Sequence, residues 1–228
     1  MIAMKVAVRL VADAMTVAIA LFGSAGTLSW WRAWALLAVL FIVRGIGARV
    51  VLRVNPALML ERAKAPIQRG QALTDKVLVV AVLAAGFVGL PLVAGFDRFR
   101  WHTLPLPSSV LAALGLLVFG AGWITKTLAL RANAFAVAVV RIQREREHAV
   151  VDAGIYSVIR HPFYAADPLI FVGLGLWLES YLAVLCAVIP IGMVLWRLRA
   201  EEKVLRRDLS GYNAYTKRVP HRLIPGVW

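Results

Sequence analysis

The residues best suited to chemistry lie in two polar segments that flank an apolar stretch. The first segment, residues 131–160, runs into the sequence RHPFY at 160–164. The second, residues 197–228, carries RAEEK at 199–203 and GYNAY at 211–215. Histidine, glutamate, arginine and tyrosine side chains bind polar ligands through charge and hydrogen bonds. The pattern therefore indicates a ligand site assembled from both segments at the boundary between water and lipid.

The sequence RHPFY predicts the start of a helix. Pro162 suits the first helical position because its φ is already helical and it has no N–H to leave unpaired. His161 would then lie beside the free N–H groups of the helix end, which favour a negative partner, and Tyr164 would lie in the first turn. A purely structural interpretation is also open, because these residue types are typical of a helix that begins at a membrane interface.

The second polar segment also allows two interpretations. Glu201 and Glu202 follow an apolar run that ends at Trp196, where carboxylates are unfavourable for the helix dipole. They are expected either to pair with neighbouring basic residues or to bind a ribose or a cationic ligand. Tyr212 and Tyr215 share one face if their segment is helical. Alternatively, the tail is an amphipathic helix on the lipid headgroups.

Six apolar runs must position these groups. Hydrophobic residues make up 61% of the 228 residues, and the mean hydropathy is +0.76, whereas soluble domains are about 45–50% apolar. The sequence therefore predicts an all-α, polytopic membrane protein. The last two runs form a C-terminal helical hairpin and are shorter than the roughly 20 residues of a full span. The predicted spans are, in order, 6–22, 34–52, 77–96, 110–130, 162–178 and 181–196.

The positive charges predict the orientation of these spans. Six spans place both termini, and both polar segments, on one side of the membrane. Of the 26 Lys and Arg residues, all but Arg32, Arg98 and Arg100 then lie on that side. Lys and Arg concentrate on the cytoplasmic side of membrane proteins. We therefore expect a multi-pass protein with cytoplasmic termini, in a bacterial inner membrane.

Several classes of partner are disfavoured. The net charge of +14 does not indicate nucleic acid, because the basic residues are scattered next to the spans and form no basic stripe with interleaved aromatic residues. Anionic lipid headgroups are the better partner. The single cysteine, Cys186, excludes an intrachain disulfide and a cysteine-based metal site. We expect no bound metal, and the oligomeric state stays open.

The polar residues also occur in an order that resembles a known family. The order is H-x-x-V-x-x-G-x-Y-x-x-x-R-H-P-x-Y at 148–164, then the apolar hairpin, then R-x-E-E at 199–202 and Y-x-x-Y-x-x-R-V-P at 212–220. On these motifs, residues 131–228 resemble the isoprenylcysteine carboxyl methyltransferases. This family belongs to the integral-membrane methyltransferases, which include the phospholipid N-methyltransferases. Residues 1–130 are similar only in forming apolar helices.

The resemblance implies two regions and a methyl donor. Residues 131–228 would be the catalytic region, using S-adenosylmethionine and releasing S-adenosylhomocysteine. Residues 1–130 would be a membrane scaffold and a possible substrate entrance. Arg199 and Glu202 would be catalytic, with Arg199 positioning the acceptor carboxylate. Asp167, where the family usually has a small residue nearby, would lie close to the acceptor. The residues implied in donor binding are Gln143, His148, Gly154, Tyr156, His161, Pro162, Tyr164, Glu201, Glu202, Tyr212 and Tyr215.

The implied reaction is an in-line methyl transfer that depends mainly on proximity and alignment. The expected acceptor is the carboxylate of an isoprenylcysteine or another lipid-like molecule. A phospholipid or other amine acceptor stays open, and acids such as Asp167 should then matter more than Arg199. Two other classes also remain. One is a membrane reductase similar to the NADPH-dependent sterol reductases, and the other is a membrane scaffold without enzymatic activity.

Overall fold

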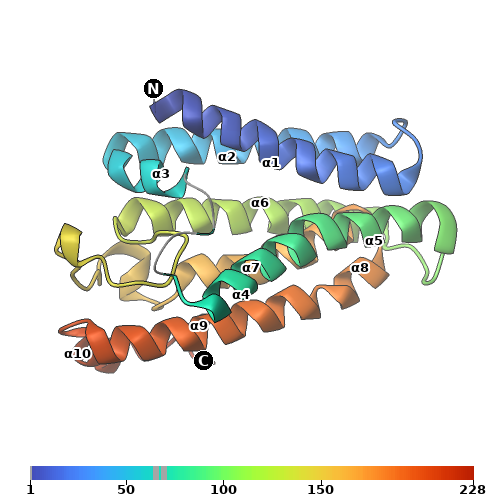
Figure 1. Cartoon of the computed structure of the whole chain (residues 1–228). Helices are drawn as coiled ribbons and strands as arrows, with labels where there is room; N and C mark the ends of the chain where they lie inside the picture. The colour runs from blue at the N-terminus through green and yellow to red at the C-terminus, as the bar shows by residue number, and fades with distance from the viewer. Residues whose placement is uncertain (1, 64–66, 68–70) are drawn as a thin grey trace.

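The computed structural model describes residues 2–63, 67 and 71–228 of the chain. Within this part, the regular structure is helical and contains no β-strand. Helices α1 (Ile2–Ala25) and α2 (Trp31–Val54) lie side by side as a pair (Figure 1). The short helix α3 (Pro56–Arg62) follows α2 directly, with Pro56 at its first position.

The third span is one continuous helical segment with two π-helical stretches. It consists of α4 (Leu73–Ala84), η1 (Ala85–Gly89), α5 (Leu90–Phe96) and η2 (Asp97–Trp101). Pro91 has no N–H to donate to the preceding turn, which is where the first π-helical stretch ends. The segment crosses the front of the molecule diagonally in Figure 1.

The C-terminal half contains the hairpin and the tail. Helix α6 (Ser109–Ala132) begins at Ser108, whose hydroxyl accepts a hydrogen bond from the Leu111 N–H at 3.3 Å. A connection with two short 3₁₀ helices, η3 (Arg144–Arg146) and η4 (Gly154–Ser157), leads to the hairpin. The remaining helices are α7 (Pro162–Trp177), α8 (Tyr181–Cys186), α9 (Val188–Asp208) and α10 (Tyr212–Arg218).

The helices confirm a polytopic membrane protein. Five helical segments of the described chain are long and apolar enough to cross a membrane, and the 16-residue α7 is a shorter apolar helix. Each predicted run falls within one of these segments, except that the run 162–178 extends one residue past the end of α7 at Trp177. One predicted boundary is wrong, because the last helix does not end at Trp196 but continues to Asp208. The segment beyond Trp196 has no proline or glycine before Asp208 and is rich in good helix formers.

Helices α6 and α7 pack with their backbones in close contact. A Cβ atom at Gly173 of α7 would lie 2.5 Å from the Phe119 nitrogen and 2.6 Å from the Gly115 oxygen, both on α6. A Cβ atom at Gly122 of α6 would lie 2.9 Å from the Ala166 oxygen. Small residues of this kind let membrane helices approach closely. The position of α7, which begins in the RHPFY motif, therefore depends on these glycines.

The polar segments gather at one end of the helix bundle. In Figure 1 the N-terminus, α3, the connection between α6 and α7, and α10 all lie at the same end. Two backbone hydrogen bonds fasten the tail to the RHPFY motif, from the Arg160 N–H to the His221 oxygen at 3.0 Å and from the His161 N–H to the Arg222 oxygen at 2.9 Å. The segments that the sequence separates are thus in direct contact.

Candidate active site

A cavity of about 620 Å³ joins the two polar segments to the N-terminal helices. Its walls come from α1, α2, α3, α4, α6, α7, α9 and α10 and from the connection between α6 and α7. Eight of the residues predicted for the site line it: His148, Tyr156, His161, Tyr164, Asp167, Glu201, Tyr212 and Tyr215. Five others are not part of its lining: Gln143, Gly154, Pro162, Arg199 and Glu202.

Glu201 is the glutamate of the pair that faces the cavity. Its carboxylate accepts a hydrogen bond from the Tyr164 hydroxyl at 2.5 Å. Arg197 lies one helical turn before Glu201 and lines the cavity with it, as expected for residues four apart. The Arg197 guanidinium donates to Asp75 Oδ1 at 2.8 Å and to the Ala138 oxygen at 2.6 Å. These contacts hold a carboxylate and a phenol at one end of the cavity.

His161 is an uncharged, buried group beside the tyrosines of the tail. Its Nε2 lies 3.4 Å from the Tyr212 hydroxyl. Burial lowers the pKa of His161 to about 4, and the positive charges of Arg160 and Arg222 act in the same direction against the opposing effect of Glu202. The imidazole is therefore neutral at neutral pH. Burial likewise raises the pKa of Tyr215 to about 12, so this hydroxyl keeps its proton.

The lowered pKa of His161 predicts how stability depends on pH. An unfolded histidine takes up a proton near pH 6.5, whereas His161 in the folded protein stays unprotonated until about pH 4. Above about pH 6.5 neither state binds the proton, and His161 has no effect on the pH dependence of stability. As the pH falls from there towards 4, the unfolded state gains the proton and the free energy of unfolding should decrease. In detergent, the unfolding temperature of the unaltered protein should fall with pH over this range. The unfolding temperature of His161→Gln should fall less steeply. Equal pH dependence in both proteins would contradict the prediction.

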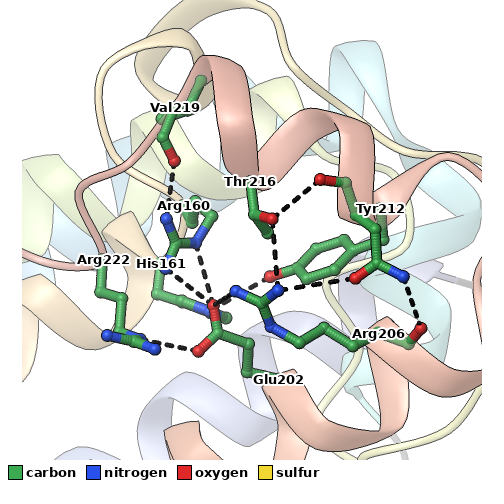
Figure 2. Close-up of polar contacts among 9 residues, drawn as sticks. Arg160, His161, Glu202, Arg206, Tyr212, Thr216, Val219 and Arg222 are labelled. Atoms are coloured by element: carbon green, nitrogen blue, oxygen red, sulfur yellow. Dashed lines mark hydrogen bonds and ion pairs between the residues drawn. The ribbon is translucent and has the colours of Figure 1, made fainter.

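Glu202 lies behind the cavity wall, in a cluster of arginines (Figure 2). Arg160 donates to Glu202 Oε1 from Nε at 3.0 Å and from a terminal nitrogen at 2.8 Å. Arg222 donates to Glu202 Oε2 at 2.6 Å, and Arg206 lies 3.5 Å from Oε1. Arg160 also donates to the Val219 oxygen at 2.7 Å. Glu202 thus joins α9, the RHPFY motif and the tail, and its oxygens are already occupied.

The two residues predicted to meet the acceptor lie in different places. Arg199 is exposed, with its guanidinium 5.6 Å from the centre of the Trp228 ring. On a helix with about 3.6 residues per turn, Arg199 lies nearly opposite Arg197, which explains why only Arg197 lines the cavity. Asp167 does line the cavity, but its partner is Lys126 of α6, whose Nζ is 2.8 Å from Asp167 Oδ1.

The connection between α6 and α7 forms a wall of the cavity through aromatic and amide side chains. The rings of Phe135 and His148 stack with centres 4.5 Å apart, and both residues line the cavity. The buried Gln143 side chain donates to the Phe135 oxygen at 2.7 Å and so braces this wall from behind. The Tyr215 hydroxyl donates to the Tyr156 oxygen at 2.7 Å, which ties the tail to the same wall.

Two of the predicted residues, Gly154 and Pro162, act through the conformation of the backbone. Gly154 has a φ of +59° at the start of η4, a conformation that favours glycine. Pro162 is the first residue of α7, as the sequence predicts. Their place in the motif has a structural explanation, since they turn the chain so that Tyr156, His161 and Tyr164 reach the cavity.

Sequence reasoning missed several lining residues. Arg62, Arg197, Phe135 and Asn133 all line the cavity. Arg197 could have been found by extending the last helix past Trp196 and comparing its faces. Arg62 ends the short helix α3 in the N-terminal half, where the sequence contains no motif to single it out.

Comparisons with known proteins bear directly on this site. The model of the family described as "Phospholipid methyltransferase" matches residues 110–210, which run from α6 to the end of α9. Together with the helical membrane fold, this match makes the chain an integral-membrane methyltransferase. The match includes the RHPFY motif and both glutamates.

Two relatives indicate which kind of integral-membrane methyltransferase the chain resembles. Protein-S-isoprenylcysteine O-methyltransferase B of Arabidopsis thaliana is 29% identical over 175 residues, covering 64% of this chain and 84% of the relative. Protein-S-isoprenylcysteine O-methyltransferase of Saccharomyces cerevisiae is 30% identical over 131 residues, covering 54% of this chain and 53% of the relative. The match thus spans about half the length of the yeast protein. These similarities support the isoprenylcysteine carboxyl methyltransferase family for this chain.

Proposed function

We propose that the protein transfers a methyl group from S-adenosylmethionine to the carboxylate of a lipophilic, isoprenylcysteine-like acceptor. The observation that carries the proposal is one cavity with two kinds of wall. Tyr164, Glu201 and Tyr212 form a polar end, and α1, α2 and α4 contribute mainly apolar residues, with Arg9, Asp13, Thr16 and Arg44 among them. A water-soluble donor and a lipid-soluble acceptor can meet in such a space.

The polar end suits the methyl donor. The Glu201 carboxylate can accept hydrogen bonds from ribose hydroxyls or from a cationic group, and the neutral His161 adds no repelling charge. The rings of Tyr156 and Tyr164 can lie against a positively charged sulfur. The donor supplies a methyl group on this sulfur, and the methyl carbon bonds to the acceptor oxygen as the carbon–sulfur bond breaks and leaves its electron pair on sulfur.

The protein's own part in this reaction is to orient and to shield. A carboxylate acceptor is already ionised at neutral pH, so no side chain needs to remove a proton. The tail closes the polar end through the hydrogen bonds from Arg160 and His161 to its backbone, which limits access of water. Holding both substrates in line is the main source of rate in such a reaction.

The charge of the cavity favours an anionic acceptor over an amine. Seven Lys and Arg residues line the cavity, against three Asp and Glu residues. Six of these cations pair with carboxylates, and Arg62, which has none within ion-pair distance among the described residues, would repel a protonated amine. Phospholipid N-methylation, which the name of the matching family model raises, is therefore the second candidate. Similarity to methyltransferases favours methyl transfer over the reductase and scaffold alternatives.

The location of the site follows from the same proposal. We place the polar end of the bundle in the cytoplasm, where the donor is made, with both termini on that side of a bacterial inner membrane. Residues 131–228 would hold the donor, and residues 1–130 would contribute the apolar wall through which the acceptor's lipid chain enters from the bilayer.

Titration of the detergent-purified protein with S-adenosylhomocysteine is the direct test. We expect binding to weaken at least tenfold in Glu201→Gln, because loss of a charge-assisted hydrogen bond costs about 1.5–3 kcal/mol. Asp208→Asn on the same helix is the matched control, since among the described residues Asp208 forms an ion pair with Arg207 alone, near the surface. Titration with NADPH runs alongside. NADPH binding without S-adenosylhomocysteine binding would contradict the proposal.

The acceptor is tested by transfer of a labelled methyl group. We expect label from S-adenosylmethionine to appear in N-acetyl-S-farnesylcysteine and not in phosphatidylethanolamine. Labelling of phosphatidylethanolamine alone would establish the amine alternative and remove the carboxylate acceptor.

A further inference from the structure

The cations that line the cavity are paired with carboxylates, with one exception. The lining contains Arg9, Arg44, Arg62, Lys126, Arg141, Arg160 and Arg197. Ion pairs join six of them to Asp13, Asp75, Glu145, Asp167 or Glu202. Among the residues that the structure describes, Arg62 alone of the seven has no carboxylate within ion-pair distance.

Arg62 ends the short helix α3 and reaches over the RHPFY motif. Its guanidinium carbon lies 4.6 Å from the centre of the Phe163 ring, and one terminal nitrogen donates to the Ala136 oxygen at 2.7 Å. The Lys126 Nζ lies 3.8 Å from the centre of the same ring. Two cations therefore contact one phenylalanine, which is the residue immediately before Tyr164 of the polar end.

An unpaired guanidinium in a cavity of this kind calls for an anion. Arg62 is partly exposed, and a charge that is partly withdrawn from water still loses solvation unless it is paired. Burial, aided by the positive charges of Arg197 and Arg44, lowers the pKa of Arg62 to about 10, so the side chain is still charged at neutral pH. Trp123 lines the cavity near Lys126, and its buried indole N–H has no hydrogen-bond partner within the described residues. Among the described residues, Arg62 therefore lacks an anionic partner, and the Trp123 N–H is a further cavity donor without an acceptor.

We propose that Arg62 is the positioning residue for the acceptor and that, with Lys126 beside it across Phe163, it binds the acceptor's carboxylate. Arg62 takes the role that the family resemblance implied for Arg199, which lies outside the cavity. The fork of a guanidinium matches a carboxylate in two parallel hydrogen bonds. The rings of Phe163 and Tyr164 have centres 6.2 Å apart, so the carboxylate is held next to the donor end. This inference rests on the proposed methyl transfer.

The test compares an acid with its uncharged amide. The protein, saturated with S-adenosylhomocysteine, is titrated with farnesylthioacetic acid and with farnesylthioacetamide, which share their lipid chain. We expect the acid to bind at least tenfold more tightly than the amide. Equal binding of the two in the unaltered protein would overturn the inference without any variant.

Variants then show which residue is responsible for the preference for the acid over the amide. In Arg62→Gln the preference for the acid should fall below threefold, and Arg62→Lys should restore part of it. Arg199→Gln, the same change on the outer face of α9, should keep the full preference. Affinity for S-adenosylhomocysteine should stay within twofold in all three, whereas a purely structural role of Arg62 beside Ala136 would weaken donor binding as well. A preference for the acid that survives in Arg62→Gln would also overturn the inference.

These titrations distinguish failure of the proposed function from failure of the role of Arg62. If the unaltered protein does not bind S-adenosylhomocysteine at all, the donor assignment fails. If it binds the donor product but does not distinguish acid from amide, only the role of Arg62 fails.

Discussion

Replacing Glu202 by glutamine is expected to lower the free energy of unfolding by about 3–5 kcal/mol, the usual cost of breaking a buried ion pair by removing one partner. The substitution leaves the buried Arg160 without a counter-ion and removes the anion shared by Arg206 and Arg222. The tail should detach from the RHPFY motif as a result. Thermal unfolding in detergent and the rate of proteolysis within the tail measure both effects.

The neighbouring glutamate supplies the matched control. Glu201→Gln changes the same chemical group one residue earlier, but on the cavity side, where it contacts Tyr164. It should weaken donor binding with little effect on unfolding. If Glu202→Gln instead abolished donor binding at unchanged stability and unchanged proteolysis, Glu202 would be a direct ligand of the donor, as its place in the family motif implies.

Replacing Gly173 by alanine is the second change with a large expected effect. The added methyl group would lie 2.5 Å from the Phe119 nitrogen and 2.6 Å from the Gly115 oxygen, and backbone atoms cannot move aside as a flexible side chain can. Overpacking of this kind costs about 1–3 kcal/mol or more. Helix α7 should shift away from α6 and take the RHPFY motif with it, so both stability and affinity for S-adenosylhomocysteine should fall.

Gly120→Ala on α6 is the control for this prediction. A Cβ atom at Gly120 would meet nothing within 4 Å, and alanine is the better helix former by about 1 kcal/mol. Its stability should therefore equal or exceed that of the unaltered protein. An unfolding temperature of Gly173→Ala equal to that of the unaltered protein would show that the two helices do not pack as described.

The helices could be predicted from the sequence because they depend on composition along a short stretch. An apolar run in lipid must satisfy its own backbone hydrogen bonds, which only a helix does within one segment. Pro162 likewise predicts the start of α7 from local geometry alone. The end of α9 was misjudged because hydropathy drops at Trp196, whereas the helix continues through polar residues to Asp208.

The order of polar residues by itself was sufficient to indicate the methyltransferase family, because a family motif is a property of spacing along the chain. It could not assign roles to two adjacent glutamates. Consecutive residues on a helix point about 100° apart. In the structure Glu201 faces the cavity and Glu202 faces the arginines, and this assignment requires the orientation of α9, which the sequence does not contain. The same rotation separates Arg197 from Arg199.

Which residues of the N-terminal half reach the site was decided by tertiary structure alone. Arg62 and Lys126 are 64 positions apart, and Phe163 lies further along the chain, yet both cations contact its ring. No local pattern predicts such a contact, because it depends on how α3, α6 and α7 pack. The sequence by itself determined that the protein spans the membrane and which family it resembles, and the packing of its helices decided which charges face the cavity.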